Sequence, residues 1–225
     1  MASRYPCWAM LVAAVVLASP GSAQAPLALP AAPEDPDPVA RYVFYLHGRI
    51  IETDGRRPTH PDYGVYEYDQ ILRALSESGV QVVSEQRSPD TGIGEYGRTV
   101  SEQVSSLLDK GVPASHIAVV GFSKGGLIAI AVSSLLGEPI SYVLLAACSE
   151  IVFDTPEFSV SGRVLSIFEE SDENGVSCRP LFDRSTMVDE TDEVRIETGA
   201  RHGAFYRPRP EWLEPTVRWI ASGAP

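Results

Sequence analysis

The fold of this chain is decided by Ile117-Ala118-Val119-Val120-Gly121-Phe122-Ser123-Lys124-Gly125-Gly126. The apolar, β-branched residues at its start predict a buried strand. The apolar run at 125–136 predicts a buried helix directly behind that strand. A strand, a glycine-rich turn and a helix in this order are typical of an α/β fold.

The turn itself, Gly121-Phe122-Ser123-Lys124-Gly125, has G-x-S-x-G spacing. Between a strand and a helix, this spacing holds the serine on a tight, strained turn with its Oγ projecting from the sheet. Glycine is expected at Gly121 and Gly125 because a side chain there would collide with the neighbouring strand and helix. Ser123 is therefore the candidate nucleophile. The alternative is a glycine-rich turn whose serine only caps the helix.

Outward from this stretch, short β-branched runs alternate with longer stretches of helical spacing. Further strands are expected at 42–46, 80–83, 142–147, 164–168 and 194–196, and further helices at 68–78, 95–110 and 212–220. Nearly all-apolar strands of this kind predict a doubly wound, mostly parallel sheet with helices on both faces. In such open sheets, ligands bind at the carboxyl ends of the strands.

Reactive residue types follow several of these strand ends. His202 is the one histidine that comes after Ser123, and it lies in a turn behind the last expected strand. It can therefore reach the serine as a general base, whereas His116 precedes the strand at 117–120 and lies at the opposite end of the sheet. Carboxylates that could orient the imidazole stand at 169–172. The alternatives are a lone surface histidine and a solvated acidic loop.

These features together resemble the α/β-hydrolase superfamily. The resemblance rests on His47-Gly48 after the first strand, on the turn at 121–125 and on His202-Gly203, and it extends over residues 41–222. The superfamily's full sheet has eight strands, so six strands imply a reduced α/β-hydrolase fold, such as that of a small bacterial enzyme without a lid. The interval between Cys148 and Gly162 is too short for a convincing lid helix, which favours an open site.

The resemblance also implies roles for the site residues. The order serine, acid, histidine favours Asp172 as the acid, with Glu169 or Glu170 as alternatives. It marks His47-Gly48 as an oxyanion loop whose next residue, Arg49, supplies a backbone N–H. The second N–H is that of Lys124 at the start of the helix. His47 is expected to be buried and to order this loop, and the side chain of Lys124 is expected to face solvent.

The function predicted from this set is that of a serine hydrolase, carboxylesterase-like, that cleaves a small carboxylic ester through Ser123, His202 and Asp172 with an acyl-enzyme intermediate. Two alternatives stay open. One is a peptidase or thioesterase on the same triad, and the other is a catalytically inactive hydrolase fold that serves as a binding protein. Residues 48–68, which include Arg56 and Arg57, could line the pocket and hold an anionic group, or form a solvated loop.

The composition limits the classes of molecule that the protein is expected to bind. Asp and Glu number 30 against 18 Lys and Arg, a net charge of −12, and no basic patch stands out that would bind nucleic acid or an anionic membrane. The histidines are scattered without ligand spacing, so neither a metal nor another cofactor is expected. The predicted partner is a small-molecule ester, and no pattern indicates an oligomeric state.

The N-terminal residues carry targeting signals. Residues 1–25 combine Arg4, an apolar run and small residues at the exit, which is typical of a secretory signal peptide, and an uncleaved anchor is the alternative. The Pro-rich residues 26–40 are expected to form a semi-extended linker before a hydrolase domain at 41–225. We therefore expect an exported protein, periplasmic or secreted and bacterial, with no membrane contact after cleavage.

Cysteine usage fits the same expectation. Of three cysteines, Cys148 and Cys178 remain once the signal peptide is removed. In an oxidising compartment these two could pair and brace the loop that carries the acid. Two free thiols are the alternative.

Overall fold

The computed structural model describes residues 27–223, apart from the isolated Met1. The expected signal peptide at residues 1–25 therefore lies outside the described part of the chain. Within residues 27–223, no helix combines the length and the apolar character needed to cross a membrane.

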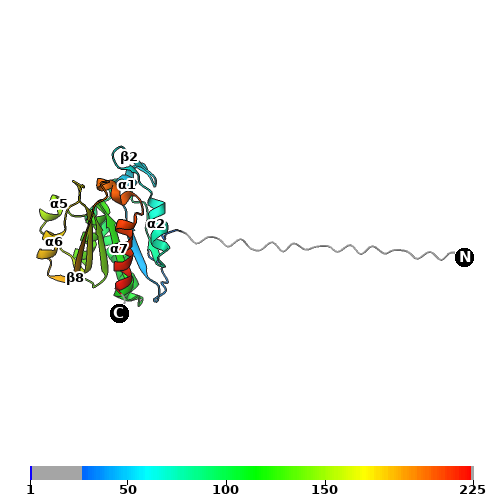
Figure 1. Cartoon of the computed structure of the whole chain (residues 1–225). Coiled ribbons are helices and arrows are strands. Elements are labelled where there is room, and N and C mark those ends of the chain that lie inside the picture. The colour runs from blue at the N-terminus through cyan, green and yellow to red at the C-terminus, as the bar shows by residue number, and fades with distance from the viewer. Residues whose placement is uncertain (2–26, 224–225) are drawn as a thin grey trace.

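A sheet of six parallel strands forms the centre of the molecule (Figure 1). Its order is β4 (Gln81–Val83), β1 (Tyr42–Leu46), β5 (Ile117–Phe122), β6 (Ser141–Leu145), β7 (Ser161–Glu169) and β8 (Met187–Ile196). The strand that leads into Ser123 is therefore central in the sheet, with β1 on one side and β6 on the other. The expected doubly wound α/β fold is confirmed.

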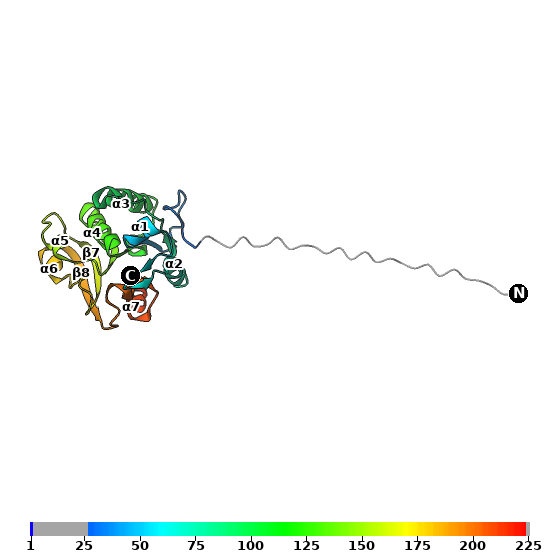
Figure 2. The ribbon, with the colours of Figure 1, turned by 90° about the horizontal axis from the view of Figure 1, so that it is seen from above.

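Helices cover both faces of this sheet, as the view of the molecule from above shows (Figure 2). One face carries α3 (Ile93–Asp109), α4 (Lys124–Leu136), α5 (Glu150–Phe153) and α6 (Arg179–Arg184), and the other carries α2 (Tyr68–Ser76) and α7 (Pro210–Ser222). Successive residues of β5 feed the two cores, because neighbouring side chains of a strand point to opposite faces. Val119 packs into the core under α3 and α4, and Val120 into the core under α2 and α7.

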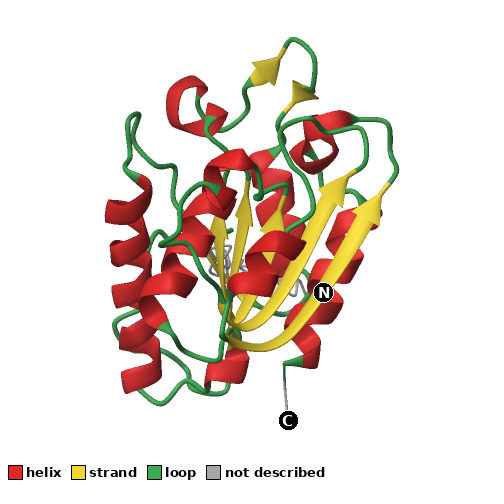
Figure 3. Ribbon diagram, turned by 90° about the vertical axis from the view of Figure 1, so that its left-hand side faces the viewer, coloured by secondary structure: helices red, strands yellow, loops and turns green. Residues whose placement is uncertain are grey.

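Short elements gather at the end of the sheet to which the strands point. They are helix α1 (Ile50–Asp54), the hairpin of β2 (Thr59–His60) and β3 (Gly64–Val65), and the 3₁₀ segment η2 (Arg201–Tyr206), whereas η1 (Ala114–His116) precedes β5. Figure 3 shows the hairpin above the carboxyl ends of the strands. This end of the sheet is where a ligand site is expected in an open parallel sheet.

The last strand is much longer than its apolar residues indicate. The expected strand at 194–196 is the end of β8, which begins at Met187 and includes Asp189, Glu190, Asp192 and Glu193. Most of these residues are exposed because β8 is an edge strand, where charges are tolerated and hinder pairing with another chain. Acidic residues therefore hid most of this strand from the sequence pattern.

The Pro-rich segment also differs from the expected linker where the structure describes it. The Leu29 N–H donates to the Val82 carbonyl oxygen at 2.8 Å, and the Ser84 N–H donates to the Leu29 carbonyl oxygen at 2.8 Å. These two bonds make a parallel bridge along the free edge of β4. Ala32 and Ala40 pack against the core, so residues 27–40 lie on the domain rather than apart from it.

Candidate active site

Ser123 occupies the strained turn that the sequence indicates. It follows β5 directly, and its φ of 54° and ψ of −119° are outside the favoured regions for a residue with a side chain. Its N–H donates to the Leu145 carbonyl oxygen at 3.0 Å, which anchors the turn to β6. A Cβ at Gly125 would collide with the Leu46 carbonyl oxygen, and one at Gly121 would collide with the backbone of Gly125. Glycine is therefore required on both sides of the serine.

His202 and Asp172 face each other from two neighbouring loops. Asp172 follows β7, His202 lies in η2, and His202 Nδ1 is 2.6 Å from Asp172 Oδ2. The Asp172 side chain is fully buried, and its other oxygen accepts the N–H of Asn174 at 2.9 Å. The His202 ring lies 4.8 Å, between centroids, from the ring of Phe122, the neighbour of the serine. Because Nδ1 is engaged, Nε2 is the ring nitrogen left for chemistry.

The two glutamates considered as alternatives to Asp172 bind elsewhere. Glu170 lies beside Arg195, with a nitrogen–oxygen distance of 3.3 Å, and both side chains are exposed. Glu169 Oε2 accepts the N–H of Ser171 at 2.8 Å, and Glu169 Oε1 accepts the N–H groups of Thr198 at 3.0 Å and Gly199 at 2.9 Å. Glu169 thus joins the loop of Asp172 to the loop of His202 without contacting the imidazole.

The pKa of Glu169 reflects this role. Burial acts to raise it, but the hydrogen bonds from Ser171, Gly199 and Thr198 stabilise the charged form and hold the pKa below its ordinary value of 4.5. The carboxylate is therefore ionised wherever the protein is near neutral pH.

On the other side of Ser123, His47 orders the loop that follows β1. The Arg87 N–H donates to His47 Nε2 at 3.0 Å, so Nδ1 carries the hydrogen and donates to the Gly48 carbonyl oxygen at 2.8 Å. Burial and then the charge of Arg87 lower the pKa of His47 from 6.5 to about 3. The ring is neutral at ordinary pH, and its place is that of the buried, loop-ordering histidine that was expected.

A buried ion network joins this loop to the turn that carries Ser123. Glu52, on α1, accepts from Arg87 Nε at 3.0 Å and from Lys124 Nζ at 2.6 Å. The side chains of Glu52 and Arg87 are almost completely buried, and that of Lys124 is 16% exposed. The expectation that the Lys124 side chain faces solvent is therefore wrong. It reaches α1, where its ammonium binds Oε2 of Glu52 while Arg87 binds Oε1, so each buried carboxylate oxygen has a cationic partner.

This network holds two backbone N–H groups near the serine. Lys124 is the first residue of α4, and Arg49 stands at the N-terminal end of α1. The N–H groups at a helix start have no partner within the helix and carry the positive end of its dipole. Arg49, Ser123 and Lys124 line one cavity together. The arrangement can stabilise an oxyanion on a carbonyl attacked by Ser123.

Two cavities meet at the serine. The first, of about 360 Å³, includes Ser123, His202, Tyr63, His60 and Arg49 in its wall; we call it the hairpin cavity. The second, of about 350 Å³, lies beside α5 and includes Ser123 and Arg49 with Ile93, Leu127 and Ile151; we call it the α5 cavity. Arg56 lies outside both, paired with Asp69 at 2.5 Å. Residues 48–68 thus contribute to the site through Arg49, through Thr53 and Asp54 of α1, and through His60 and Tyr63 of the hairpin.

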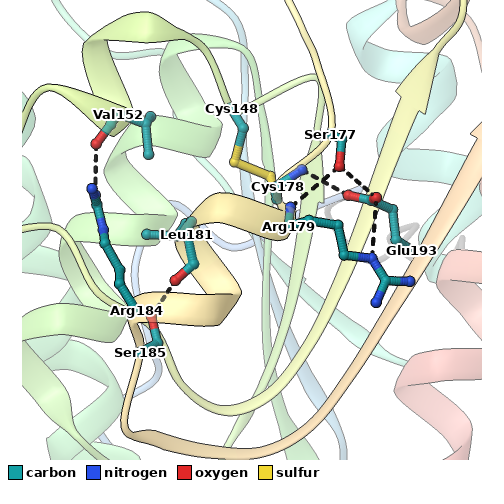
Figure 4. Close-up of a disulfide and its surroundings, with 9 residues drawn as sticks. All are labelled: Cys148, Val152, Ser177, Cys178, Arg179, Leu181, Arg184, Ser185 and Glu193. Atoms are coloured by element: carbon teal, nitrogen blue, oxygen red, sulfur yellow. Dashed lines mark hydrogen bonds and ion pairs between the residues drawn. A yellow bond between two sulfur atoms is a disulfide. The ribbon is translucent and has the colours of Figure 1, made fainter.

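Cys148 and Cys178 form a disulfide, as their positions in the chain suggested (Figure 4). Their Cα atoms are 5.3 Å apart, and the Val176 N–H donates to the Cys148 carbonyl oxygen at 2.9 Å. The Cys178 N–H donates to Glu193 on β8 at 2.7 Å. The loop that carries Asp172 is thereby fixed at its far end to both β6 and β8.

Four residues of the site carry no local sequence signal. Glu52 and Arg87 lie far from Ser123 in the chain, and their burial in one network depends on the tertiary fold. Tyr63 and Asn174 meet across the site, with Asn174 Nδ2 donating to Tyr63 Oη at 3.2 Å. Only the position of Tyr63 in the stretch at 48–68 suggested that it lies near the pocket.

Comparison with known proteins agrees with this geometry. Residues 79–163, from the turn after α2 to the start of β7, match the model of the phospholipase/carboxylesterase family. The match includes Ser123 and stops before Asp172 and His202. A search of curated proteins gives no match.

Solved structures resemble the chain over most of its length. An esterase of Pyrococcus furiosus has a TM-score of 0.53 and 15% identity, with 83% of this chain and 84% of that chain covered. A predicted CIB-like hydrolase of Thermoplasma acidophilum has a TM-score of 0.52 and 16% identity, with 81% and 86% covered.

The chain has the α/β-hydrolase fold, in a reduced form with six parallel strands, so the fold that the sequence indicated is confirmed. Within this fold, its central segment matches the model of the phospholipase/carboxylesterase family, which supports an ester-cleaving hydrolase as the class of enzyme.

Proposed function

We propose that this protein hydrolyses carboxylic esters through Ser123, His202 and Asp172. One observation carries the proposal. Ser123 sits in the strained turn and shares a cavity with His202, whose Nδ1 contacts a fully buried carboxylate at 2.6 Å. A serine, an imidazole and a buried acid in this order give an activated nucleophile.

The reaction runs in two halves. Ser123 Oγ attacks the ester carbonyl while His202 Nε2 takes its proton, and Asp172 stabilises the imidazolium. The N–H groups of Lys124 and Arg49 hold the oxyanion. His202 then gives the proton to the departing alcohol as the carbonyl–oxygen bond breaks, leaving an acyl-enzyme. Water, deprotonated by the same imidazole, releases the acid and restores Ser123.

Labelling with a fluorophosphonate probe tests the activated serine. The wild-type protein is expected to be labelled and to hydrolyse p-nitrophenyl butanoate, whereas Ser123→Ala and His202→Ala are expected to do neither. Ser76→Ala, at the end of α2, is the matched control and should behave as the wild type. If folded wild-type protein is neither labelled nor active, the proposal is refuted, and the fold would serve binding rather than catalysis. Turnover of thioesters or peptides in preference to esters would redirect the substrate class.

We also propose that the protein is exported. The Cys148–Cys178 disulfide supports this, because such bonds persist mainly in oxidising compartments. Expression of the full chain in bacteria, followed by fractionation and N-terminal sequencing, tests it. An exported form that starts near residue 26 is expected, and an uncleaved form that stays in the membrane fraction would contradict the proposal.

A further inference from the structure

We propose that the two cavities at Ser123 divide the substrate, with an aliphatic acyl chain in the α5 cavity and the ring of an aromatic alcohol in the hairpin cavity. This inference rests on the proposed function, because it assigns the two sides of the bond that Ser123 would attack. It identifies the substrate class as an aryl ester of a linear fatty acid.

The direction of the substrate follows from the position of His202. The α5 cavity and the hairpin cavity share Ser123 and Arg49, but His202 lines the hairpin cavity alone. The imidazole that accepts the proton of Ser123 Oγ must deliver it to the oxygen of the leaving alcohol. That oxygen must therefore lie on the hairpin side. The acyl group, bonded to Oγ after the alcohol departs, extends the other way.

The wall of the α5 cavity suits an uncharged acyl chain. Ile93, Leu127, Ala147 and Ile151 contribute apolar surface, and Ile151 on α5 is 62% exposed. The ammonium of Lys124, which also borders this cavity, is engaged by Glu52 at 2.6 Å. A carboxylate or phosphate on the acyl group would therefore compete with Glu52 for Lys124, and Arg49, the other cation in this wall, is shared with the hairpin cavity. Methylene groups instead gain from leaving water.

The wall of the hairpin cavity is aromatic with a polar rim. The rings of His60 and Tyr63 stack with centroids 4.3 Å apart, and Tyr206 and Phe122 lie beside them. Aromatic side chains attract a further ring by stacking or edge contact. Thr53 and Asp54 border the same cavity and are exposed, so they can bind hydroxyl groups on that ring.

Two ester series with the wild-type enzyme test the assignment. In phenyl esters from acetate to hexanoate, kcat/KM is expected to rise about two- to fourfold for each added methylene. Among butanoates, a phenyl ester is expected to exceed a fluoroalkyl ester of equally acidic alcohol by roughly two- to tenfold. Matching the acidity of the alcohols removes the difference in intrinsic reactivity.

Two variants then separate the cavities, and each is the control for the other. Ile151→Asp places a charge at an exposed position of the α5 cavity and should flatten the dependence on acyl length while leaving the phenyl preference intact. His60→Ala should reduce the phenyl preference several-fold while leaving the acyl dependence intact.

The reverse pattern, in which Ile151→Asp alters the choice of alcohol and His60→Ala alters the choice of acyl chain, would overturn the assignment. An active enzyme with no preference in either series would overturn it as well. In both cases the serine would still be labelled by fluorophosphonate, so the proposed function would stand. A folded protein that is not labelled and cleaves none of the esters would remove both proposals together.

Discussion

The two halves of the site are held by different forces. One half, residues 47–52 with Arg87 and Lys124, is fixed by the buried charges around Glu52; we call it the ionic half. The other, residues 169–178 and 198–202, is fixed by N–H groups that converge on Glu169 and by the Cys148–Cys178 disulfide; we call it the cross-linked half.

This difference determines which kind of change weakens each half of the site. A buried ion network is strongly stabilising only while it is complete, because removing one member leaves the others charged in a medium that solvates them poorly. The disulfide carries no charge, and the Glu169 carboxylate is held by neutral backbone N–H groups instead of by an opposing ion. The ionic half should therefore respond to substitution and pH, and the cross-linked half to reductant.

The largest effect is expected within the cross-linked half, at Asp172, the carboxylate that contacts His202. Asp172→Asn should lower kcat roughly 10⁴-fold, because an amide no longer fixes the imidazole tautomer or stabilises its charge. Steady-state hydrolysis of p-nitrophenyl butanoate measures the change. Glu170→Gln, at an exposed carboxylate two residues away, should leave kcat unchanged. Equal losses in the two variants would mean that the acid had been assigned wrongly.

The next effect concerns the ionic half. Glu52→Gln leaves Arg87 and Lys124 without a counter-charge, so the free energy of unfolding should fall by about 3–5 kcal/mol. Urea unfolding followed by circular dichroism measures the loss. Glu77→Gln, at an exposed position after α2, is the control and should change stability by less than about 0.5 kcal/mol. A loss no larger than that of the control would show that the network contributes little.

The cross-linked half offers the corresponding stability test. Replacing Cys148 and Cys178 together by serine should lower the free energy of unfolding by about 2–4 kcal/mol, since the bond closes a loop of 30 residues. Reductant should destabilise the wild type by a similar amount and the double variant not at all. Destabilisation of both proteins by reductant would point to another cause.

The free energy of unfolding should also depend on pH differently in the two halves, and this effect is expected to be smaller. His47 titrates near pH 6.5 when unfolded but about pH 3 when folded, so below pH 6.5 the unfolded chain binds a proton that the folded chain does not. The free energy of unfolding should therefore fall as the pH is lowered, by up to about 1.4 kcal/mol per unit. The pKa of Glu169 is lowered from 4.5, so its contribution is lost only as the pH falls below that value.

The window between pH 6.5 and pH 4.5 thus reports on His47 and not on Glu169. Urea unfolding of His47→Gln should show a shallower slope there than the wild type, and Glu169→Gln should show the wild-type slope. Identical slopes for the wild type and His47→Gln would contradict a neutral, buried His47.

Sequence patterns predicted the parts of the molecule that short-range physics determines. The apolar run of β5, the glycines at Gly121 and Gly125 and the helical spacing of α4 each have a local cause, and the structure reproduces all three. Because the strands are parallel, their order in the chain also places Ser123, Asp172 and His202 at one end of the sheet. At that end the structure brings Asp172 and His202 into contact.

The remaining parts depend on contacts between distant residues. Glu52 looks like an ordinary surface glutamate until Arg87 and Lys124 close around it, so the Lys124 side chain was misplaced. The choice among Glu169, Glu170 and Asp172 depends on how one loop turns, which no period in the sequence encodes. The segment around Leu29 has the composition of a linker, and its bond to β4 depends on an unpaired strand edge that only the assembled sheet provides.

The segment around Leu29 has a consequence for how the protein behaves in crowded solution. A sheet with two open edges invites other chains to add strands, which is a common first step of aggregation. Here β4 is closed along part of its edge by the chain's own backbone, while β8 presents the exposed side chains of Asp189, Glu190 and Asp192. One edge is thus protected sterically and the other by mutual repulsion. Only the second protection weakens in concentrated salt, so self-association under those conditions should begin at β8.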